Sequence, residues 1–245
     1  MLSQIEGRNP VLEALRSGRA LNKILISKDI ERHSAIAEIL HLSKQKRVPV
    51  EYVDPQVLKA RASGVSQGVI AYASAKGYAD IDDLLADIKT KNEPAFLVVL
   101  DGLEDPHNLG AILRTADASG VHGVVIPERR SVGLTETVAK VSAGAVEYIP
   151  VARVININNT IKKLKEAGIW VIGIEEDAPK VYTSMDFKLP TALVLGGEGK
   201  GISRLVKENC DELVSIPMKG KISSLNASVA AAIVMFEVVK QRTNK

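Results

Sequence analysis

Short apolar runs alternate with stretches of helical periodicity from residue 95 to the end of the chain, and this alternation restricts the possible fold more than any other feature. Residues 96–100 form a nearly continuous apolar run, as expected for a strand in a parallel sheet that helices cover on both faces. Residues 109–119 have a helical pattern, which Gly120 is suited to end because glycine tolerates a left-handed backbone. Further strands are expected at 121–126, 170–174, 192–195 and 213–216, and further helices at 135–142, 157–167, 202–209 and 225–241. The sequence therefore predicts an α/β domain with a mostly parallel sheet over residues 94–245.

The last of these helices carries a regular apolar stripe. Leu225, Val229, Ile233 and Phe236 follow one another at intervals of 4, 4 and 3 residues. Such spacing places the four side chains on one side of a helix, and the sequence predicts that this side is buried.

Residues 1–73 predict a second, smaller α/β unit. Helices are expected at 9–15 and 34–46, and strands at 23–27, 48–53 and 68–72. Asp54 is suited to cap a further helix that follows it. Residues 74–93 are polar and charged, contain a short amphipathic stretch at 81–88, and are expected to connect the two domains.

Composition excludes several kinds of protein. Apolar residues make up 46% of the 245-residue chain, which is enough for a core, whereas aromatic residues make up only 4%, too few for a protein that stacks many bases. The net charge of +3 is compatible with an RNA partner but weak evidence for one. The single cysteine, Cys210, excludes an intramolecular disulfide and a cysteine-based zinc site. The N-terminus has no signal-peptide pattern and no apolar run is long enough for a membrane span, so we expect a cytoplasmic protein.

Three separated segments each combine an apolar strand, a turn of small residues and the start of a helix. They are residues 108–116, 195–201, and 216–218 continuing to 223–230. Such turns let backbone amides approach a ligand closely. Each segment also carries polar residues without an evident folding role, namely Asn108, Arg114, Glu198, Ser224 and Asn226.

The glycine-rich segment does not match the common nucleotide-binding loops. The Walker pattern requires Ser or Thr after its Gly-Lys pair, and the Rossmann pattern requires a different glycine spacing near the first strand. A plain tight turn is the alternative for this segment. Asn108 and Ser224 could each simply cap a helix, and Arg114 could be an ordinary surface residue. Arg129 and Arg130 follow an expected strand and are modest candidates for contacts with an RNA backbone, against the simpler reading as a solvated loop.

In order and spacing, the three segments resemble the signature motifs of the SpoU/TrmH (SPOUT) family of RNA 2′-O-ribose methyltransferases. Residues 5–15, 67–71, 101–110, 116–122 and 210–218 extend the resemblance over nearly the whole chain, with the RlmB-type 23S rRNA guanosine-2′-O-methyltransferases as the nearest subgroup. Small departures are Gly197, where the family often has Ala or Asn, and Ala227, where it often has Val.

The resemblance implies a fold and a cofactor. It implies an N-terminal domain similar to ribosomal protein L30e that helps to bind RNA, and a C-terminal domain with a deep trefoil knot. It implies a homodimer that binds S-adenosylmethionine largely through backbone groups and needs no metal. The residues to which this cofactor site maps are Gly196, Gly197, Ile216, Met218, Ser224 and Leu225.

The resemblance also implies the catalytic set Asn108, Arg114, Glu198, Ser224 and Asn226. A guanidinium remains protonated in proteins, so we interpret Arg114 as a clamp on the RNA phosphate rather than as a literal general base. Three alternatives stay open. The first is a related methyltransferase that acts on another rRNA or tRNA site, since close relatives methylate other sites. The second is a knotted RNA-binding protein without catalysis, which would not need this polar set, and the third is a transferase acting on small molecules, which would not need an RNA-binding domain.

Overall fold

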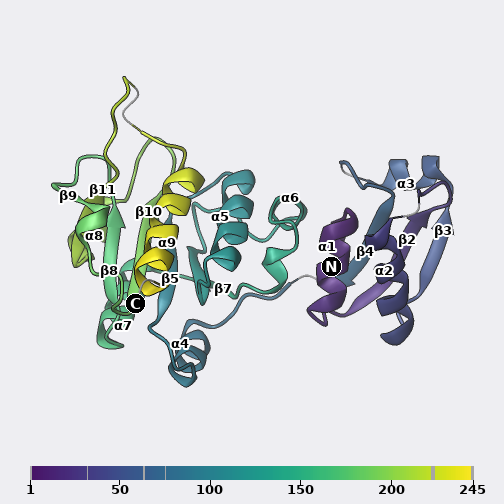
Figure 1. The fold of residues 1–245 in the computed structure, drawn as a ribbon, viewed down its shortest axis with the longest axis horizontal. Coiled ribbons are helices and arrows are strands. Elements are labelled where there is room, and N and C mark those ends of the chain that lie inside the picture. The colour runs from purple at the N-terminus through teal and green to yellow at the C-terminus, as the bar shows by residue number, and fades with distance from the viewer. Residues whose placement is uncertain (1, 32, 63, 75, 222–223, 244–245) are drawn as a thin grey trace. The chain divides into compact units, whose positions relative to one another are not determined.

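The computed structural model describes residues 2–31, 33–62, 64–74, 76–221 and 224–243. Its internal contacts divide the chain into two compact units (Figure 1). The first contains Met1–Gly77 together with Gly133–Tyr148, and the second contains Tyr78–Val132 and Ile149–Lys245.

The first unit is built on a four-stranded sheet with the order β1-β4-β2-β3. β4 pairs antiparallel with both β1 and β2, and β2 pairs parallel with β3. The elements are β1 (Leu2–Glu6), α1 (Arg8–Arg16), β2 (Leu21–Ser27), α2 (Ser34–Gln45), β3 (Val50–Val53), α3 (Pro55–Arg61), β4 (Val69–Ser74), α6 (Glu136–Val141) and the 3₁₀ turn η1 (Ala145–Glu147).

The predicted helices and strands of the first 73 residues are confirmed, and β1 is an additional strand that the sequence pattern did not indicate. The core of the first unit consists of apolar side chains from α1, α2 and one face of the sheet, including Leu15, Ile24 and Ile39. Asp54 occupies the N-cap position of α3 as predicted, but its carboxylate pairs with Lys28 at 3.0 Å and accepts no bond from the helix.

The second unit contains a seven-stranded sheet with the order β7-β6-β5-β10-β8-β11-β9. Every neighbouring pair in it is parallel, which confirms the predicted architecture. Its elements are α4 (Ile81–Thr90), β5 (Phe96–Asp101), α5 (Pro106–Ala118), β6 (Gly123–Pro127), β7 (Val151–Val154), α7 (Ile157–Glu166), β8 (Trp170–Ile174), β9 (Lys180–Val181), the 3₁₀ turn η2 (Tyr182–Ser184), β10 (Thr191–Gly196), α8 (Arg204–Asn209), β11 (Glu212–Ser215) and α9 (Ala227–Thr243).

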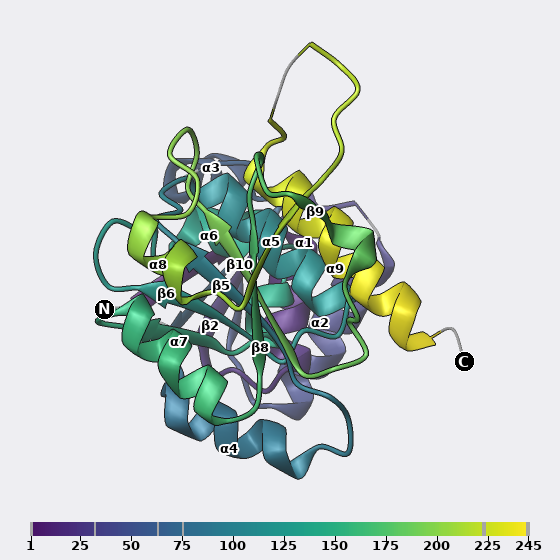
Figure 2. The same cartoon turned by 90° about the vertical axis from the view of Figure 1, so that its left-hand side faces the viewer.

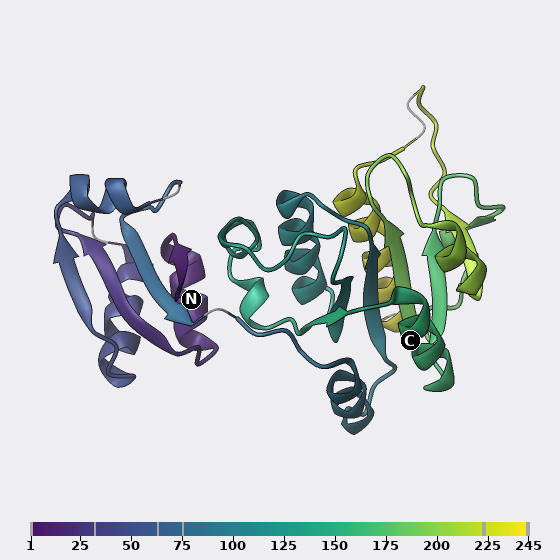
Figure 3. The same cartoon turned by 180° about the vertical axis from the view of Figure 1, so that it is seen from behind.

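Helices cover both faces of this sheet. α5 and α9 pack together on one face, and α7 and α8 pack together on the other (Figures 2 and 3). β5 supplies side chains to both faces in alternation: Leu97 and Val99 join the cluster under α7 and α8, while Val98 and Leu100 point to the opposite face. β5 is therefore buried throughout, as its continuous apolar sequence predicted.

The segment expected to be a connection is only partly extended. Its amphipathic stretch forms α4, which is capped by the Asp80 side chain and buries Leu84 and Ile88 in the core of the second unit. The domain limits 1–73 and 94–245, with a linker at 74–93, stay a proposal, as does the trefoil knot.

The helix α9 differs from the prediction in the face that it buries. Its buried side is formed by Ala231, Val234, Met235 and Val238, whereas Val229 and Phe236 are 46% and 49% exposed. The apolar stripe is present, but it lies on the exposed side of the helix, so the prediction that it is buried is wrong. In the part of the chain that the structure describes, no helix is long and apolar enough to cross a membrane.

Candidate active site

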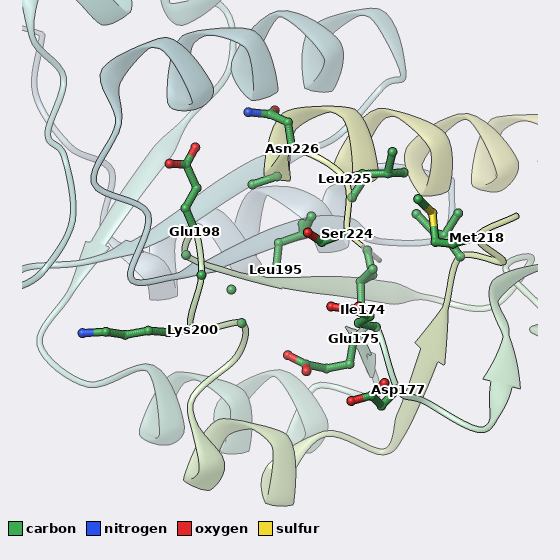
Figure 4. A pocket seen from close by; sticks show the side chains of 18 residues that line it. Ile174, Glu175, Asp177, Leu195, Glu198, Lys200, Met218, Ser224, Leu225 and Asn226 are labelled. Atoms are coloured by element: carbon green, nitrogen blue, oxygen red, sulfur yellow. The ribbon is translucent and has the colours of Figure 1, made fainter. Parts of the chain in front are cut away.

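A cavity of about 680 Å³ lies where β8, β10 and β11 end at their carboxyl termini (Figure 4). Ligands of open parallel sheets commonly bind at this edge. All six residues expected to hold a cofactor line the cavity: Gly196, Gly197, Ile216, Met218, Ser224 and Leu225. They come from two segments that are separate in sequence, the end of β10 and the loop between β11 and α9. That loop is described up to residue 221 and again from 224, so Ser223 lies outside the described residues.

The wall between β10 and α8 is a tight glycine turn. The Gly201 amide donates to the Gly197 carbonyl at 3.1 Å, and the Gly197 amide donates to the Asp101 carbonyl at 2.9 Å. A Cβ on Gly196 would lie 1.9 Å from the Gly201 carbonyl carbon, and a Cβ on Gly197 would lie 2.1 Å from the Gly102 carbonyl oxygen. A side chain at either position would require the turn to shift, because backbone, not a flexible side chain, occupies the space.

Glu175, at the end of β8, holds this turn from the cofactor side. Its Oε1 accepts from the Ile202 amide at 2.6 Å, and its Oε2 pairs with Lys207 at 2.5 Å. With both oxygens engaged, Glu175 fixes the glycine turn relative to α8. Glu175 was not expected as a site residue, although three acidic residues directly after an apolar strand, Glu175 to Asp177, were a visible signal.

Asn108 and Glu198 meet beside the cavity. Asn108 is buried in the first turn of α5, and its Nδ2 donates to the Glu198 carboxylate. The alternative that Asn108 caps its helix is wrong: α5 begins at Pro106, and Asp105 caps it by accepting from the His107 amide at 2.8 Å. The Asn108 side chain therefore bonds to Glu198, and this contact joins the first sequence motif to the second.

Asn226 is the residue that caps α9. Its Oδ1 accepts from the Ser228 amide at 2.9 Å and from the Ser228 hydroxyl at 2.6 Å, and the residue also lines the cavity. The alternative role of Ser224 as a helix cap is wrong, because α9 begins at Ala227, after Asn226. Ser224 instead lines the cavity, and Figure 4 shows Glu198 and Asn226 on the side of the cavity opposite Glu175 and Asp177.

Arg114 is set apart from the other predicted catalytic residues. It is exposed on α5 and does not line the cavity. Among the residues that the structure describes, none forms an ion pair with Arg114. Its guanidinium is therefore available to a ligand from outside this chain.

The cavity carries more negative than positive charge. Glu175, Glu176, Asp177 and Glu198 line it, against one basic residue, Lys200, whose side chain points away from Ser224 and Leu225 (Figure 4). Carboxylates near a cavity stabilise a bound cation by direct Coulomb attraction. Within the described ranges no group of His, Cys, Asp and Glu side chains is arranged to hold a metal ion.

Comparison with known proteins identifies the family of this chain. Residues 95–236 match the SpoU rRNA Methylase family, and residues 4–79 match the RNA 2′-O ribose methyltransferase substrate-binding domain. The chain belongs to the SpoU rRNA methylase family. This match confirms, at the level of the family, the resemblance seen in the sequence. It also confirms the expectation of an RNA methyltransferase with an α/β fold.

Similar proteins extend over nearly the full length of the chain. YacO of Bacillus subtilis, assigned to the TrmH family of tRNA/rRNA methyltransferases, is 50% identical over 236 residues, which cover 96% of this chain and 94% of that protein. A Staphylococcus saprophyticus protein of the same assignment is 50% identical over 238 residues, 97% of this chain and 95% of its own.

Solved structures show the same architecture. The SpoU methyltransferase AviRb from Streptomyces viridochromogenes, in complex with S-adenosylmethionine, superimposes with a TM-score of 0.83 at 26% identity, over 100% of this chain and 92% of that one. An RNA 2′-O ribose methyltransferase superimposes with a TM-score of 0.81 at 26% identity, over 98% of this chain and 89% of its own.

Proposed function

We propose that this protein transfers a methyl group from S-adenosylmethionine to a ribose 2′-hydroxyl of RNA, and that the nucleotide is a guanosine of 23S rRNA. The observation that carries the proposal is the cavity at the glycine turn, with the Asn108–Glu198 pair beside it. The activity would take place in the cytoplasm, where ribosomal RNA is available.

The cavity fits the cofactor in size, shape and charge. Its volume of about 680 Å³ is within the range of roughly 300–1,000 Å³ that is typical of small-molecule sites. Gly196 and Gly197 let the turn close tightly against its own backbone at the edge of the cavity, which suits a ligand held through backbone groups. The surrounding carboxylates favour a cationic ligand, and S-adenosylmethionine carries a positive sulfonium. When bound, it supplies an activated methyl group, so no metal is required.

The residues of this chain would then place the ribose and the phosphate. Asn108 holds the Glu198 carboxylate, and that carboxylate can in turn accept a hydrogen bond from a ribose hydroxyl. Holding the hydroxyl in line with the methyl group lowers the entropic part of the barrier. Ser224 and Asn226 lie on the same cavity and can support this position.

Arg114 would act on the RNA phosphate. Its planar guanidinium can form two parallel hydrogen bonds with a phosphate, and the positive charge stabilises negative charge that develops on the ribose oxygen. It stays protonated throughout, so the proton of the hydroxyl leaves late or through water.

The outer face of α9 supports the proposal of a homodimer. Val229 and Phe236 are about half exposed, and Leu225 and Met218 at the cavity are 38% and 39% exposed. An apolar helix face next to a ligand site is a natural contact for a second copy of the chain. The active site would then lie close to the subunit interface.

The N-terminal domain is proposed to recognise RNA, in keeping with its match to the substrate-binding domain. It is expected to be dispensable for folding of residues 94–245 but needed for RNA affinity. A fragment of residues 94–245 that methylates rRNA at full efficiency would contradict this role.

Incubation with radiolabelled S-adenosylmethionine, in the presence and absence of rRNA, tests the function. We expect label in the RNA and one cofactor site per chain or per half of the dimer. RNA binding without cofactor binding would instead identify a non-catalytic module, and label transferred only to small molecules would identify a different transferase.

A further inference from the structure

A second cavity lies on the other side of the glycine turn from the cofactor cavity. Its volume is about 640 Å³, and it is lined by loops that follow β5, β6, β7 and β10. Gly197, Glu198, Lys200 and Gly201 line both cavities, so a single turn separates them. We propose that this second cavity binds the phosphates of the RNA strand next to the target ribose, through Arg129, Arg130 and Lys200. This inference rests on the proposed function, because it assigns the place of the RNA in that reaction.

The position of the cavity follows from the sheet. β10 lies between β5 and β8, so its carboxyl end is where the two halves of the sheet meet. One cavity opens over the β8 and β11 side and the other over the β5, β6 and β7 side. A reaction between two ligands needs them on adjoining sites, and Glu198 is part of both walls. A ligand in the second cavity is thus close to the Asn108–Glu198 pair.

Within the described residues, the cations of this cavity form no ion pair. Arg129 and Arg130 are exposed and line the cavity together with Lys200. Across the described part of the chain, no carboxylate forms an ion pair with any of the three. Lys200 also points away from the cofactor side in Figure 4. Three unpaired cations around a single cavity favour a ligand that carries more than one negative charge.

The carboxylates of the same cavity are mostly engaged. Asp101 accepts from the Ser203 amide at 2.7 Å, Asp105 accepts from the His107 amide, and Glu198 accepts from Asn108. These neutral donors engage the carboxylate oxygens and stabilise the ionised carboxylates, although each keeps its charge. Glu104 is the remaining carboxylate, and it is exposed.

The turn that bears the two arginines is held in one conformation. The Ser131 hydroxyl donates to the Pro127 carbonyl at 2.5 Å, and the Val132 amide donates to the Leu103 carbonyl at 2.9 Å. Arg130 has a φ of 56°, a left-handed backbone that is uncommon for a residue with a side chain. Such local strain concentrates at ligand sites, where it places side chains that an ordinary turn would direct elsewhere.

The arrangement favours a phosphate backbone over a base. Arginine and lysine contacts with phosphates set the position of a nucleic acid and are independent of sequence. Aromatic side chains, on which bases stack, do not line this cavity within the described residues. The cavity would therefore set the position of the ribose relative to the cofactor, while the choice of nucleotide is made elsewhere.

The test compares two double variants of the full chain. The first combines Arg129→Ala with Arg130→Asn, because asparagine tolerates the left-handed backbone at that position. The control combines Lys162→Ala with Lys188→Ala, which removes the same charge from exposed positions that line neither cavity. Affinity for a 23S rRNA transcript is measured as a function of salt, and affinity for S-adenosylmethionine is measured on the same samples.

We expect the arginine variant to bind the transcript at least tenfold more weakly, on the order of one lost charge-assisted contact or more. The slope of log affinity against log salt should fall in magnitude by about 1.4 to 2. The control should change both quantities much less, and cofactor affinity should stay the same in both variants. Equal losses in the two variants, or a loss of cofactor affinity in the arginine variant, would overturn the proposal.

Failure of the proposed function would look different. A wild-type chain that binds the transcript but never methylates it would refute the methyltransferase, whereas the comparison of the two variants would still decide whether the arginines hold RNA. As a second check, Arg129→Lys with Arg130→Lys should keep most of the salt dependence, because the charges remain, while methylation slows through loss of the planar contacts.

Discussion

Gly196→Ala is expected to abolish tight cofactor binding, although it adds only one methyl group. The new Cβ would lie 1.9 Å from the Gly201 carbonyl carbon and 2.2 Å from the Ile202 nitrogen. Ordinary contact between carbon atoms requires about 3.5 Å. The opposing backbone must therefore withdraw by roughly 1.6 Å, the difference between the two distances, and the turn that forms the wall of the cavity must open.

The cost follows from the bonds that such a shift would break. The Gly201 to Gly197 hydrogen bond and the Ile202 to Glu175 bond both bridge the displaced segment. A neutral hydrogen bond contributes about 1 kcal/mol, and one to a charged acceptor contributes about 2 kcal/mol. A penalty of about 3 kcal/mol against the binding-competent turn corresponds to roughly a hundredfold loss of affinity.

Isothermal titration calorimetry with S-adenosylmethionine measures this loss directly. The matched control is Gly77→Ala, because no atom lies within 4 Å of the position of its Cβ and its φ is not in the left-handed region. Thermal unfolding of both variants shows whether the fold is retained. Wild-type cofactor affinity in a folded Gly196→Ala protein would refute the reasoning that the turn forms the cofactor site.

Three further predictions concern Arg114, the outer face of α9 and the Cys210 thiol. Arg114→Lys and Arg114→Ala should each slow single-turnover methylation by about a hundredfold, roughly 3 kcal/mol of lost transition-state stabilisation. Cofactor affinity should stay nearly unchanged, and a large loss of it would place Arg114 on the methyl donor instead of the RNA. Phe236→Glu should shift the protein towards monomer in analytical ultracentrifugation at micromolar concentration, because it puts a charge on the outer apolar face of α9. A wild-type protein that is already monomeric would contradict the proposed dimer. Burial raises the pKa of the Cys210 thiol from 9.0 to about 12, so at pH 8 the thiolate fraction is about a thousandfold lower than in the unfolded chain. Iodoacetamide should accordingly label Cys210 slowly in native protein and rapidly in urea, and equal rates would contradict its burial.

The regular part of the fold could be predicted because burial leaves a direct trace in the sequence. β5 is apolar at every position from Phe96 to Leu100, and the structure covers it on both faces. Gly120 ends α5 with a φ of 71°, as its position predicted. Local capping was less predictable, since Asp54, Asn108 and Ser224 all had side chains able to cap, yet none of the three forms a side-chain cap in the folded chain.

The face of α9 shows why a pattern alone was insufficient. The helix has two apolar stripes, one containing Val229 and Phe236 and one containing Ala231, Val234 and Met235. Both satisfy helical periodicity, and only the packing of α9 on α5 determines which one is covered. Glu175 was missed for a related reason, because its partners Ile202 and Lys207 are distant in sequence and meet it only in the folded sheet.

Mass spectrometry of nucleosides released from rRNA gives the most direct test of the central claim. Purified protein is incubated with 23S rRNA transcript and S-adenosylmethionine that carries a deuterated methyl group. We expect a 2′-O-methylguanosine that carries the label at one position of the RNA, and its absence when Glu198→Gln replaces the wild type. Label on a base rather than on a ribose, or no label in RNA that the protein binds together with the cofactor, would contradict it.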